Sequence, residues 1–344
     1  MHITPPQFKP PAGLRNRHLQ TILSSVGPRR IRLRKAKRQL RSTAQKLILD
    51  AGDGVRLLGF LNRPLDPSNG QCDANLASTA NDSTLVILIH GWEGSDESSY
   101  MLSAASTLIA AGFSVMRLNL RDHGDSHHLN EAAFNSTLLD EVVGAIKTLQ
   151  SEHKFDQYHL AGFSLGGNFA LRVAAAAVGH DISLTSVSAF CPVVHAELAN
   201  SALVEPRNWL YNAYFVRKWK RSLQLKSKHF PKLYNQRDFA TLKSLDEMNQ
   251  TLIPKYTSFS ELSDYFDAYA IVDDRLSQTV CPCYLHFASD DMIIPVEGVA
   301  RINMSHNLQI EITDHGGHCG YISNWGFDSW QDERLLQIVR HFNK

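Results

Sequence analysis

Short apolar segments that alternate with longer amphipathic segments constrain the fold of this chain more than any other feature. The apolar segments have the length of strands, and the segments between them have the length and periodicity of helices. Such an alternation is typical of a parallel sheet flanked by crossover helices. We therefore predict an α/β fold with strands at residues 84–89, 114–119, 157–163, 184–190, 283–288 and 309–313, and with helices at residues 100–111, 138–151, 165–178, 296–303 and 330–341.

The segments outside this alternation divide the chain into further parts. Residues 46–61 predict a hairpin of two extended strands, and the turn-rich residues 64–83 predict a surface loop. The alternation stops between His195 and Arg275, where helical and irregular patches replace it. We interpret residues 195–275 as a helical lid inserted into a core of residues 50–194 and 276–344, which is preceded by a basic N-terminal arm of residues 1–49.

The charged residues are distributed unevenly along the chain. The first 49 residues contain 12 of the 35 Lys and Arg residues but none of the 34 Asp and Glu residues. A basic segment of this kind can bind nucleic acid or an anionic membrane surface, or it can lie against an acidic surface of its own chain. No nucleic-acid-binding signature accompanies the arm. We therefore favour packing within the chain, expect no nucleic-acid partner, and leave peripheral contact with a membrane open.

Membrane insertion and secretion are not expected from the sequence. No apolar run reaches the roughly 18 to 20 residues that span a bilayer, and the N-terminal segment lacks the features of a secretory signal. The five cysteines are odd in number, and no two of them are separated by the two intervening residues that are typical of zinc or redox motifs. We therefore predict free thiols and a cytoplasmic location.

The motif Gly162-Phe-Ser-Leu-Gly166 lies between a predicted strand and a predicted helix. In this context a G-x-S-x-G motif is typical of a nucleophilic serine that is held in a strained strand-to-helix turn. The glycines are needed because side chains at those positions would collide within the turn. We predict that Ser164 is a catalytic nucleophile and that the peptide N–H of Leu165 stabilises negative charge on a substrate oxygen.

A serine nucleophile requires a base, and the base requires a carboxylate that orients it. Asp290 and Asp291 follow the predicted strand at residues 283–288, at the end of the sheet where active sites of parallel sheets lie. A glycine-rich loop after the next strand contains His315 and His318. We choose Asp291 as the acid and His318 as the base. Asp290 remains an alternative acid, with Asp291 as a helix cap, and His315 remains an alternative base.

A second hydrogen-bond donor for the substrate oxygen is expected in the loop after the first central strand. The peptide N–H of Trp92 is the candidate, and we interpret His90 as a residue that shapes this loop. Three further histidines, His123, His127 and His128, lie in a loop after a strand without a recognised ligand spacing. We therefore predict no metal and no cofactor.

Five segments spread over nearly the whole chain carry a family resemblance: Asn16-Arg-His-Leu-Gln-Thr21, His90-Gly-Trp-Glu-Gly-Ser95, Gly162-Phe-Ser-Leu-Gly-Gly-Asn168, Asp290-Asp291 and Gly316-Gly-His318. With them the chain resembles the α/β-hydrolase fold, and more narrowly the bacterial YheT-like hydrolases and their eukaryotic ABHD-type esterase relatives. The resemblance implies a mostly parallel central sheet flanked by helices, with an inserted helical lid. It also implies hydrolysis of carboxylic esters, including lipid esters, with Ser164, Asp291 and His318 at the charge-relay positions.

The triad residues predict a serine esterase that forms an acyl-enzyme on Ser164 and needs no cofactor.

The segment of residues 207–232 bears on the substrate. In it, aromatic side chains are interleaved with eight Lys or Arg and no acid, which indicates an apolar passage with cationic edges or an amphipathic helix packed on the core. Residues 121–124 and 134–136, where the chain departs from the family that it resembles, both lie in loops that are expected to shape the pocket. We expect a small-molecule or lipid ester, including medium-chain acyl esters, as the substrate. An acyltransferase with the same triad and a catalytically silent binding module remain alternatives, and the oligomeric state is open.

Overall fold

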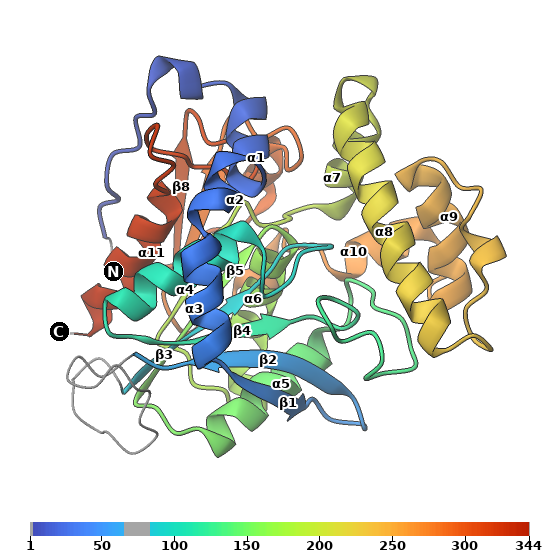
Figure 1. Cartoon of the computed structure of the whole chain (residues 1–344), viewed down its shortest axis with the longest axis horizontal. Coiled ribbons are helices and arrows are strands. Elements are labelled where there is room, and N and C mark those ends of the chain that lie inside the picture. The colour runs from blue at the N-terminus through green and yellow to red at the C-terminus, as the bar shows by residue number, and fades with distance from the viewer. Residues whose placement is uncertain (1–2, 65–82, 344) are drawn as a thin grey trace.

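The computed structural model describes residues 3–64 and 83–343. The strands of these residues are β1 (Gln45–Asp50), β2 (Arg56–Asn62), β3 (Thr84–Ile89), β4 (Ser114–Asn119), β5 (Gln157–Phe163), β6 (Ser186–Phe190), β7 (Cys283–Ala288) and β8 (Leu308–Thr313). They form one sheet at the centre of the molecule, in the order β1-β2-β4-β3-β5-β6-β7-β8 (Figure 1). Neighbouring strands pair in parallel along the part of the sheet that runs β4-β3-β5-β6-β7-β8. In contrast, β2 pairs antiparallel with both β1 and β4. The predicted mostly parallel sheet is confirmed.

The residues of β3 show how helices cover both faces of the sheet. Leu85 and Ile87 pack in one core with α5 (Leu139–Glu152) and α6 (Leu165–Ala176). Val86 packs in a second core with α4 (Ser99–Ala110) and α11 (Trp330–Phe342). Because successive side chains of a strand point to opposite faces, a continuous apolar run is the pattern of a strand that is buried on both sides. All six residues of β3 are buried.

The predicted elements agree with the structure to within two residues at their ends, with two differences. The helix expected at residues 296–303 is a 3-10 helix, Val296–Arg301, which contains Gly298. Glycine disfavours a regular α-helix, and short 3-10 pieces commonly replace one. The expected boundary of the arm at residue 49 falls inside β1, which pairs with β2 from Gln45 onward. Residues 65–82 of the expected surface loop lie outside the described residues.

The described part of the basic arm folds into three α-helices that the sequence analysis did not predict: α1 (Arg17–Ser25), α2 (Pro28–Arg32) and α3 (Arg34–Thr43). In Figure 1 the blue helix α3 crosses in front of α4, and α1 lies above α4. The Arg29 side chain is buried and lies 3.8 Å from the Asp332 carboxylate of α11. Lys37 of α3 pairs with Glu97 at 2.8 Å. The arm is thus attached to the sheet domain through ion pairs with acidic residues.

Between β6 and β7 the described chain contains four α-helices, which we call the helical insertion: α7 (Ala196–Val204), α8 (Trp209–His229), α9 (Leu245–Tyr256) and α10 (Leu262–Ala268). α8 and α9 lie side by side on the right of Figure 1, away from α11. Lys226 of α8 is buried, and its Nζ donates to Asp122 Oδ1 at 2.7 Å and to the Asn130 carbonyl at 2.6 Å. These bonds tie the helical insertion to the loop after β4. Neither α8 nor any other helix of the described residues is long and apolar enough to cross a membrane.

Candidate active site

Ser164 lies in a sharp turn between β5 and α6. Its backbone has φ 55° and ψ −121°, a conformation that residues other than glycine rarely adopt. The turn leaves no room for neighbouring side chains. A Cβ at Gly162 would lie 2.1 Å from the Gly166 carbonyl oxygen, and a Cβ at Gly166 would lie 2.3 Å from the Ile89 carbonyl oxygen. The close packing of β5, α6 and β3 therefore requires both glycines of the motif.

The imidazole of His318 connects Ser164 to Asp291. His318 Nε2 lies 2.9 Å from Ser164 Oγ, and His318 Nδ1 lies 2.8 Å from Asp291 Oδ2. The three residues follow β5, β7 and β8, which are parallel, so the carboxyl ends of these strands meet at one edge of the sheet. The structure thus brings the predicted nucleophile, acid and base into one hydrogen-bonded chain.

The two neighbouring aspartates have different partners. Asp291 uses Oδ2 for His318 and Oδ1 for two peptide N–H groups of the following turn, at 2.8 and 3.0 Å. Asp290 Oδ1 accepts the peptide N–H of Gly317 at 2.8 Å, and its Oδ2 lies 3.8 Å from His315 Nδ1. Asp291 therefore contacts the imidazole and caps a turn at the same time. Asp290 and His315 lie beside the chain of three residues rather than within it.

The surroundings of His318 favour its protonated form. Burial by itself lowers the pKa of the imidazole, but the negative charge of Asp291, together with the neighbouring Cys319 sulfur, more than offsets burial and raises the pKa to about 9. The Asp291 side chain is only 2% exposed, so little water screens its charge. An imidazole with a raised pKa is a strong base once it has lost its proton.

Two residues that line the same cavity as Ser164 have peptide N–H groups without an acceptor among the described residues. They are Leu165, the first residue of α6, and Trp92, in the loop after β3. His90 holds that loop in place, because its Nε2 accepts the peptide N–H of Leu120 at 3.1 Å. Unpaired N–H groups beside a helix N-terminus are suited to stabilising negative charge on a substrate oxygen.

Potential metal ligands gather beside the base, at a place that the sequence analysis did not identify. Within the described residues, Cys191, Cys319 and His318 bring ligand atoms to within 4.8 Å of one another. Both thiols are buried and free, and both imidazole nitrogens already make hydrogen bonds. The cysteines are 128 residues apart in the chain, so no spacing pattern in the sequence links them.

The loop that contains His123 was the other place considered for a metal. Both ring nitrogens of His123 contact backbone groups, at 2.7 and 3.0 Å.

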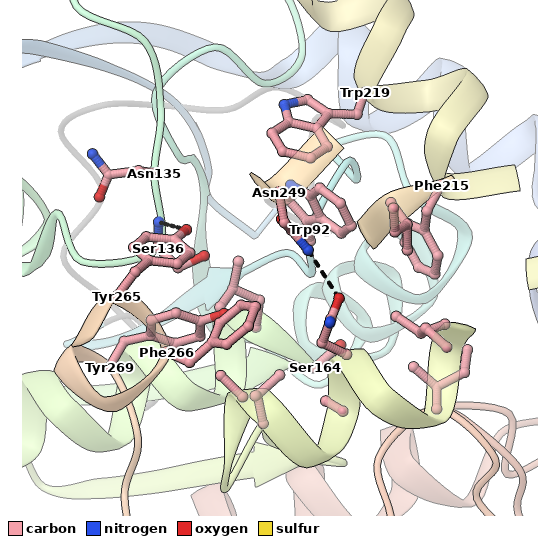
Figure 2. A pocket seen from close by; sticks show the side chains of 18 of the residues that line it. Trp92, Asn135, Ser136, Ser164, Phe215, Trp219, Asn249, Tyr265, Phe266 and Tyr269 are labelled. Atoms are coloured by element: carbon pink, nitrogen blue, oxygen red, sulfur yellow. Dashed lines mark hydrogen bonds between the residues drawn. The ribbon is translucent and has the colours of Figure 1, made fainter. Parts of the chain in front are cut away.

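A cavity of about 110 Å³ that opens to solvent has Ser164 in its lining (Figure 2). Aromatic side chains line one side of it. Trp92 stacks on Phe215 with the ring centres 5.2 Å apart, and it meets the edge of Trp219 at 5.4 Å. Figure 2 shows a second aromatic wall that faces them, formed by Tyr265, Phe266 and Tyr269. Part of the aromatic segment at residues 207–232 therefore lines the cavity, through Phe215 and Trp219 of α8.

Polar groups interrupt this apolar lining at two places. The peptide N–H of Ser136 donates to the Tyr265 hydroxyl at 3.0 Å, and Asn249 Nδ2 donates to Asn200 Oδ1 at 2.8 Å (Figure 2). Of the two segments that the sequence analysis expected to shape the pocket, residues 134–136 all line the cavity and residues 121–124 are not part of its lining. The two polar places are already hydrogen-bonded within the chain, so the surface that remains for a ligand is largely apolar.

The chain belongs to the alpha/beta hydrolase family, whose model matches residues 86–327. This range includes Ser164, Asp291 and His318. The chain is similar to an abhydrolase domain-containing protein of Dictyostelium discoideum, at 22% identity over 290 residues that cover 82% of this chain and 73% of that protein. It is also similar to the AB hydrolase superfamily protein YisY of Bacillus subtilis, at 34% identity over 109 residues that cover 31% of this chain and 38% of that protein.

Solved structures of hydrolases share the fold. An esterase of Pyrococcus furiosus matches with a TM-score of 0.56 at 15% identity, over 88% of this chain and 91% of the esterase. Est1E of Butyrivibrio proteoclasticus matches with a TM-score of 0.50 at 18% identity, over 86% of this chain and 96% of Est1E. Together with the family match, these similarities confirm the predicted α/β-hydrolase fold.

We predict that Gly162→Ala lowers the free energy of unfolding by about 3 kcal/mol, because the added methyl group collides with the Gly166 carbonyl. The matched control is Gly179→Ala, because a Cβ at Gly179 meets no atom within 4 Å. Urea unfolding followed by circular dichroism measures both variants. Equal stability of the two variants would contradict the crowding at the turn.

Proposed function

We propose that this protein is a serine hydrolase that cleaves carboxylic esters through an acyl-enzyme on Ser164. The observation that carries the proposal is the hydrogen-bonded chain from Ser164 Oγ through His318 to Asp291, with the unpaired N–H groups of Trp92 and Leu165 beside it. The family and the esterases among the similar structures support a hydrolase in general. The narrower likeness to YheT-like and ABHD-type enzymes and a cytoplasmic location belong to the same proposal.

In the first half of the reaction, neutral His318 accepts the hydroxyl proton of Ser164 while Oγ attacks the ester carbonyl carbon. The carbonyl oxygen becomes negatively charged and is stabilised by the peptide N–H groups of Trp92 and Leu165. His318 then donates its proton to the leaving alkoxide, so that the alcohol departs and the acyl group stays on Ser164. Asp291 keeps the imidazole oriented and stabilises its positive charge.

In the second half of the reaction, water takes the place of the alcohol. His318 accepts a proton from the water molecule, and the resulting hydroxide attacks the acyl carbon on Ser164. The same two N–H groups stabilise the second oxyanion. His318 then returns the proton to Ser164 Oγ as the bond to the acyl group breaks. The products are a carboxylic acid and the regenerated serine.

The lining of the cavity favours a substrate with an apolar acyl group. The side chains around Ser164 are mostly aromatic or aliphatic, including Trp92, Phe215 and Trp219. Burial of each additional methylene group stabilises a complex by about 0.8 kcal/mol. A longer acyl chain therefore binds more tightly until it fills the space. We propose small-molecule or lipid esters with medium-chain acyl groups as substrates.

We predict that Ser164→Ala lowers kcat for ester hydrolysis by about 10³-fold or more, because no other group can form the acyl-enzyme. Steady-state hydrolysis of a p-nitrophenyl ester measures the loss, and thermal unfolding shows that the variant is folded. The control is Ser188→Ala, since Ser188 is a buried serine of β6 whose hydroxyl has no hydrogen-bond partner among the described residues. Full turnover by Ser164→Ala would defeat the proposal.

We predict that kcat/KM rises with pH up to about 9, because only neutral His318 can accept the serine proton and its pKa is raised to about 9. Asp291→Asn removes the charge that raises this pKa. Burial, which lowers the pKa, is then no longer offset by that charge, so the acid limb of the profile should move well below pH 9, while the rate falls by about 10³- to 10⁴-fold.

The control for that experiment is Asp290→Asn, in which the amide oxygen can still accept the Gly317 peptide N–H. We expect its pH profile to resemble that of the wild type. If Asp290→Asn, rather than Asp291→Asn, moves the acid limb, then Asp290 is the acid that orients the base.

We predict that kcat/KM for p-nitrophenyl esters rises by about fourfold for each methylene group from acetate into the medium-chain range. Phe215→Ala removes part of the cavity wall and should weaken this dependence. Tyr214→Ala is the matched control, because the neighbouring Tyr214 side chain is 50% exposed and does not line the cavity. Activity confined to the acetate ester would rule out an acyl-chain pocket.

A further inference from the structure

Helix α1 of the basic arm contacts the loop that carries His318, which we call the His318 loop (residues 316–322). The hydroxyl of Thr21 accepts the peptide N–H of His318 at 2.9 Å. The same hydroxyl donates its own proton to the Arg17 carbonyl at 2.9 Å. Because its proton is committed to the helix, the oxygen presents a lone pair to His318. Thr21 thus holds the backbone of the base directly.

Gln20, the residue before Thr21, holds the far end of the same loop. Its Oε1 accepts the peptide N–H of Ile322 at 2.7 Å, and its Nε2 donates to the Ile322 carbonyl at 3.1 Å and to the Leu14 carbonyl at 2.7 Å. The Gln20 side chain is fully buried. A buried amide that pairs with both backbone groups of one residue fixes the position of that residue, since breaking either bond would leave a buried polar group unsatisfied.

The glycines of the His318 loop allow its backbone to approach the backbone of α1. A Cβ at Gly317 would lie 2.6 Å from the Arg17 carbonyl oxygen, and a Cβ at Gly320 would lie 2.6 Å from the Gln20 carbonyl oxygen. Gly317 also has φ +53°, in the region that favours glycine. Neither position could carry a side chain without moving α1 and the loop apart.

The helix that makes these contacts is fixed locally, and the loop is held from a second side as well. The side chain of Asn16 caps α1 by accepting the peptide N–H groups of His18 and Leu19 at 2.9 and 3.1 Å. At the other side of the loop, Asp290 accepts the peptide N–H of Gly317. The His318 loop therefore lies between α1 and the end of β7.

We propose that Thr21 and Gln20 are positioning residues of the active site: they hold the His318 loop so that the imidazole reaches Ser164 and Asp291 at the same time. This inference rests on the proposed function. It gives the segment Asn16-Arg-His-Leu-Gln-Thr21 a task that the basic charge of the arm does not explain. Misplacement of a catalytic group by about 1 Å can lower a rate by about 10²-fold, so a small movement of the loop is sufficient to affect turnover.

The test replaces the Thr21 hydroxyl with a methyl group of nearly the same size. We expect T21V to lower kcat by about tenfold or more while KM changes by less than about twofold, because the substrate cavity is left intact. Thr21→Ser keeps the hydroxyl and should restore kcat to within about twofold of the wild-type value. If T21V does not fold, Thr21→Ala removes the same hydroxyl without adding a methyl group.

The matched control is T43V, on α3. Thr43 also donates to the carbonyl four residues earlier, at 3.0 Å from Gln39, and also accepts an N–H, from Asn62 at 2.9 Å. T43V therefore loses the same two kinds of hydrogen bond away from the His318 loop. We expect its melting temperature to fall at least as far as that of T21V, while its kcat stays at the wild-type level. Equal loss of kcat in T43V would assign the effect of T21V to general stability.

A second measurement does not depend on turnover. NMR titration of the His318 ring reports how closely Asp291 holds the imidazole, and we expect the pKa of His318 to fall by about one unit in T21V but not in T43V. If the wild type does not hydrolyse esters, the proposed function fails, yet this shift still tests the positioning. A T21V variant whose His318 titration and kcat both match those of the wild type would overturn the inference.

Discussion

The position of Ser164 depends on a tight turn in which the residues two positions before and two positions after it, Gly162 and Gly166, have no room for a side chain. A residue held at positive φ costs roughly 1–3 kcal/mol, so the surrounding packing must maintain it. Ser164 meets this condition, because its N–H donates to the Phe190 carbonyl at 2.8 Å and its carbonyl accepts from Gly167 and Asn168 at 2.9 and 3.1 Å. These hydrogen bonds to β6 and α6 thereby offset the backbone strain at Ser164. The result is a half-buried hydroxyl that is held at the carboxyl edge of the sheet.

The parallel sheet brings groups that are distant in sequence to this serine. His318 is 154 residues away in the chain, and Asp291 lies 27 residues before His318. Each follows a strand that ends at the same edge, so a short loop is enough to deliver each side chain. The helical insertion then supplies Phe215 and Trp219, which cover the serine with an apolar wall. The sheet thus positions the chemistry, and the insertion shapes the space for a ligand.

Much of the core could be predicted from the sequence, because its signals are local. A continuous apolar run marks β3, and the glycines around Ser164 mark the turn that follows β5. The arm could not be predicted in the same way. Its helices depend on distant partners, such as Asp332 for Arg29, and a run of basic residues alone gives no sign of them. Tertiary contacts of this kind supply most of the stability of short helices.

At the active site, the sequence did not show which side chains contact one another. Asp290 and Asp291 are adjacent and chemically identical, and only the folded loop shows that Asp291 contacts the imidazole. The pairing of Gln20 with Ile322 is equally invisible in sequence, since it joins residues 302 positions apart. The Asn16-Arg-His-Leu-Gln-Thr21 segment signalled a resemblance, and its contacts with the His318 loop suggest a physical reason for it.

Formation of a covalent acyl-enzyme is the property on which the proposed function depends most directly. A fluorophosphonate probe mimics the ester, because attack by the serine oxygen forms an O–P bond and releases fluoride. Peptide mass spectrometry of the labelled wild-type protein then identifies the modified residue. We expect one modification, on the peptide that contains Ser164. Labelling at another residue, or an unlabelled Ser164 in a protein that still hydrolyses esters, would contradict the assignment of Ser164 as the nucleophile.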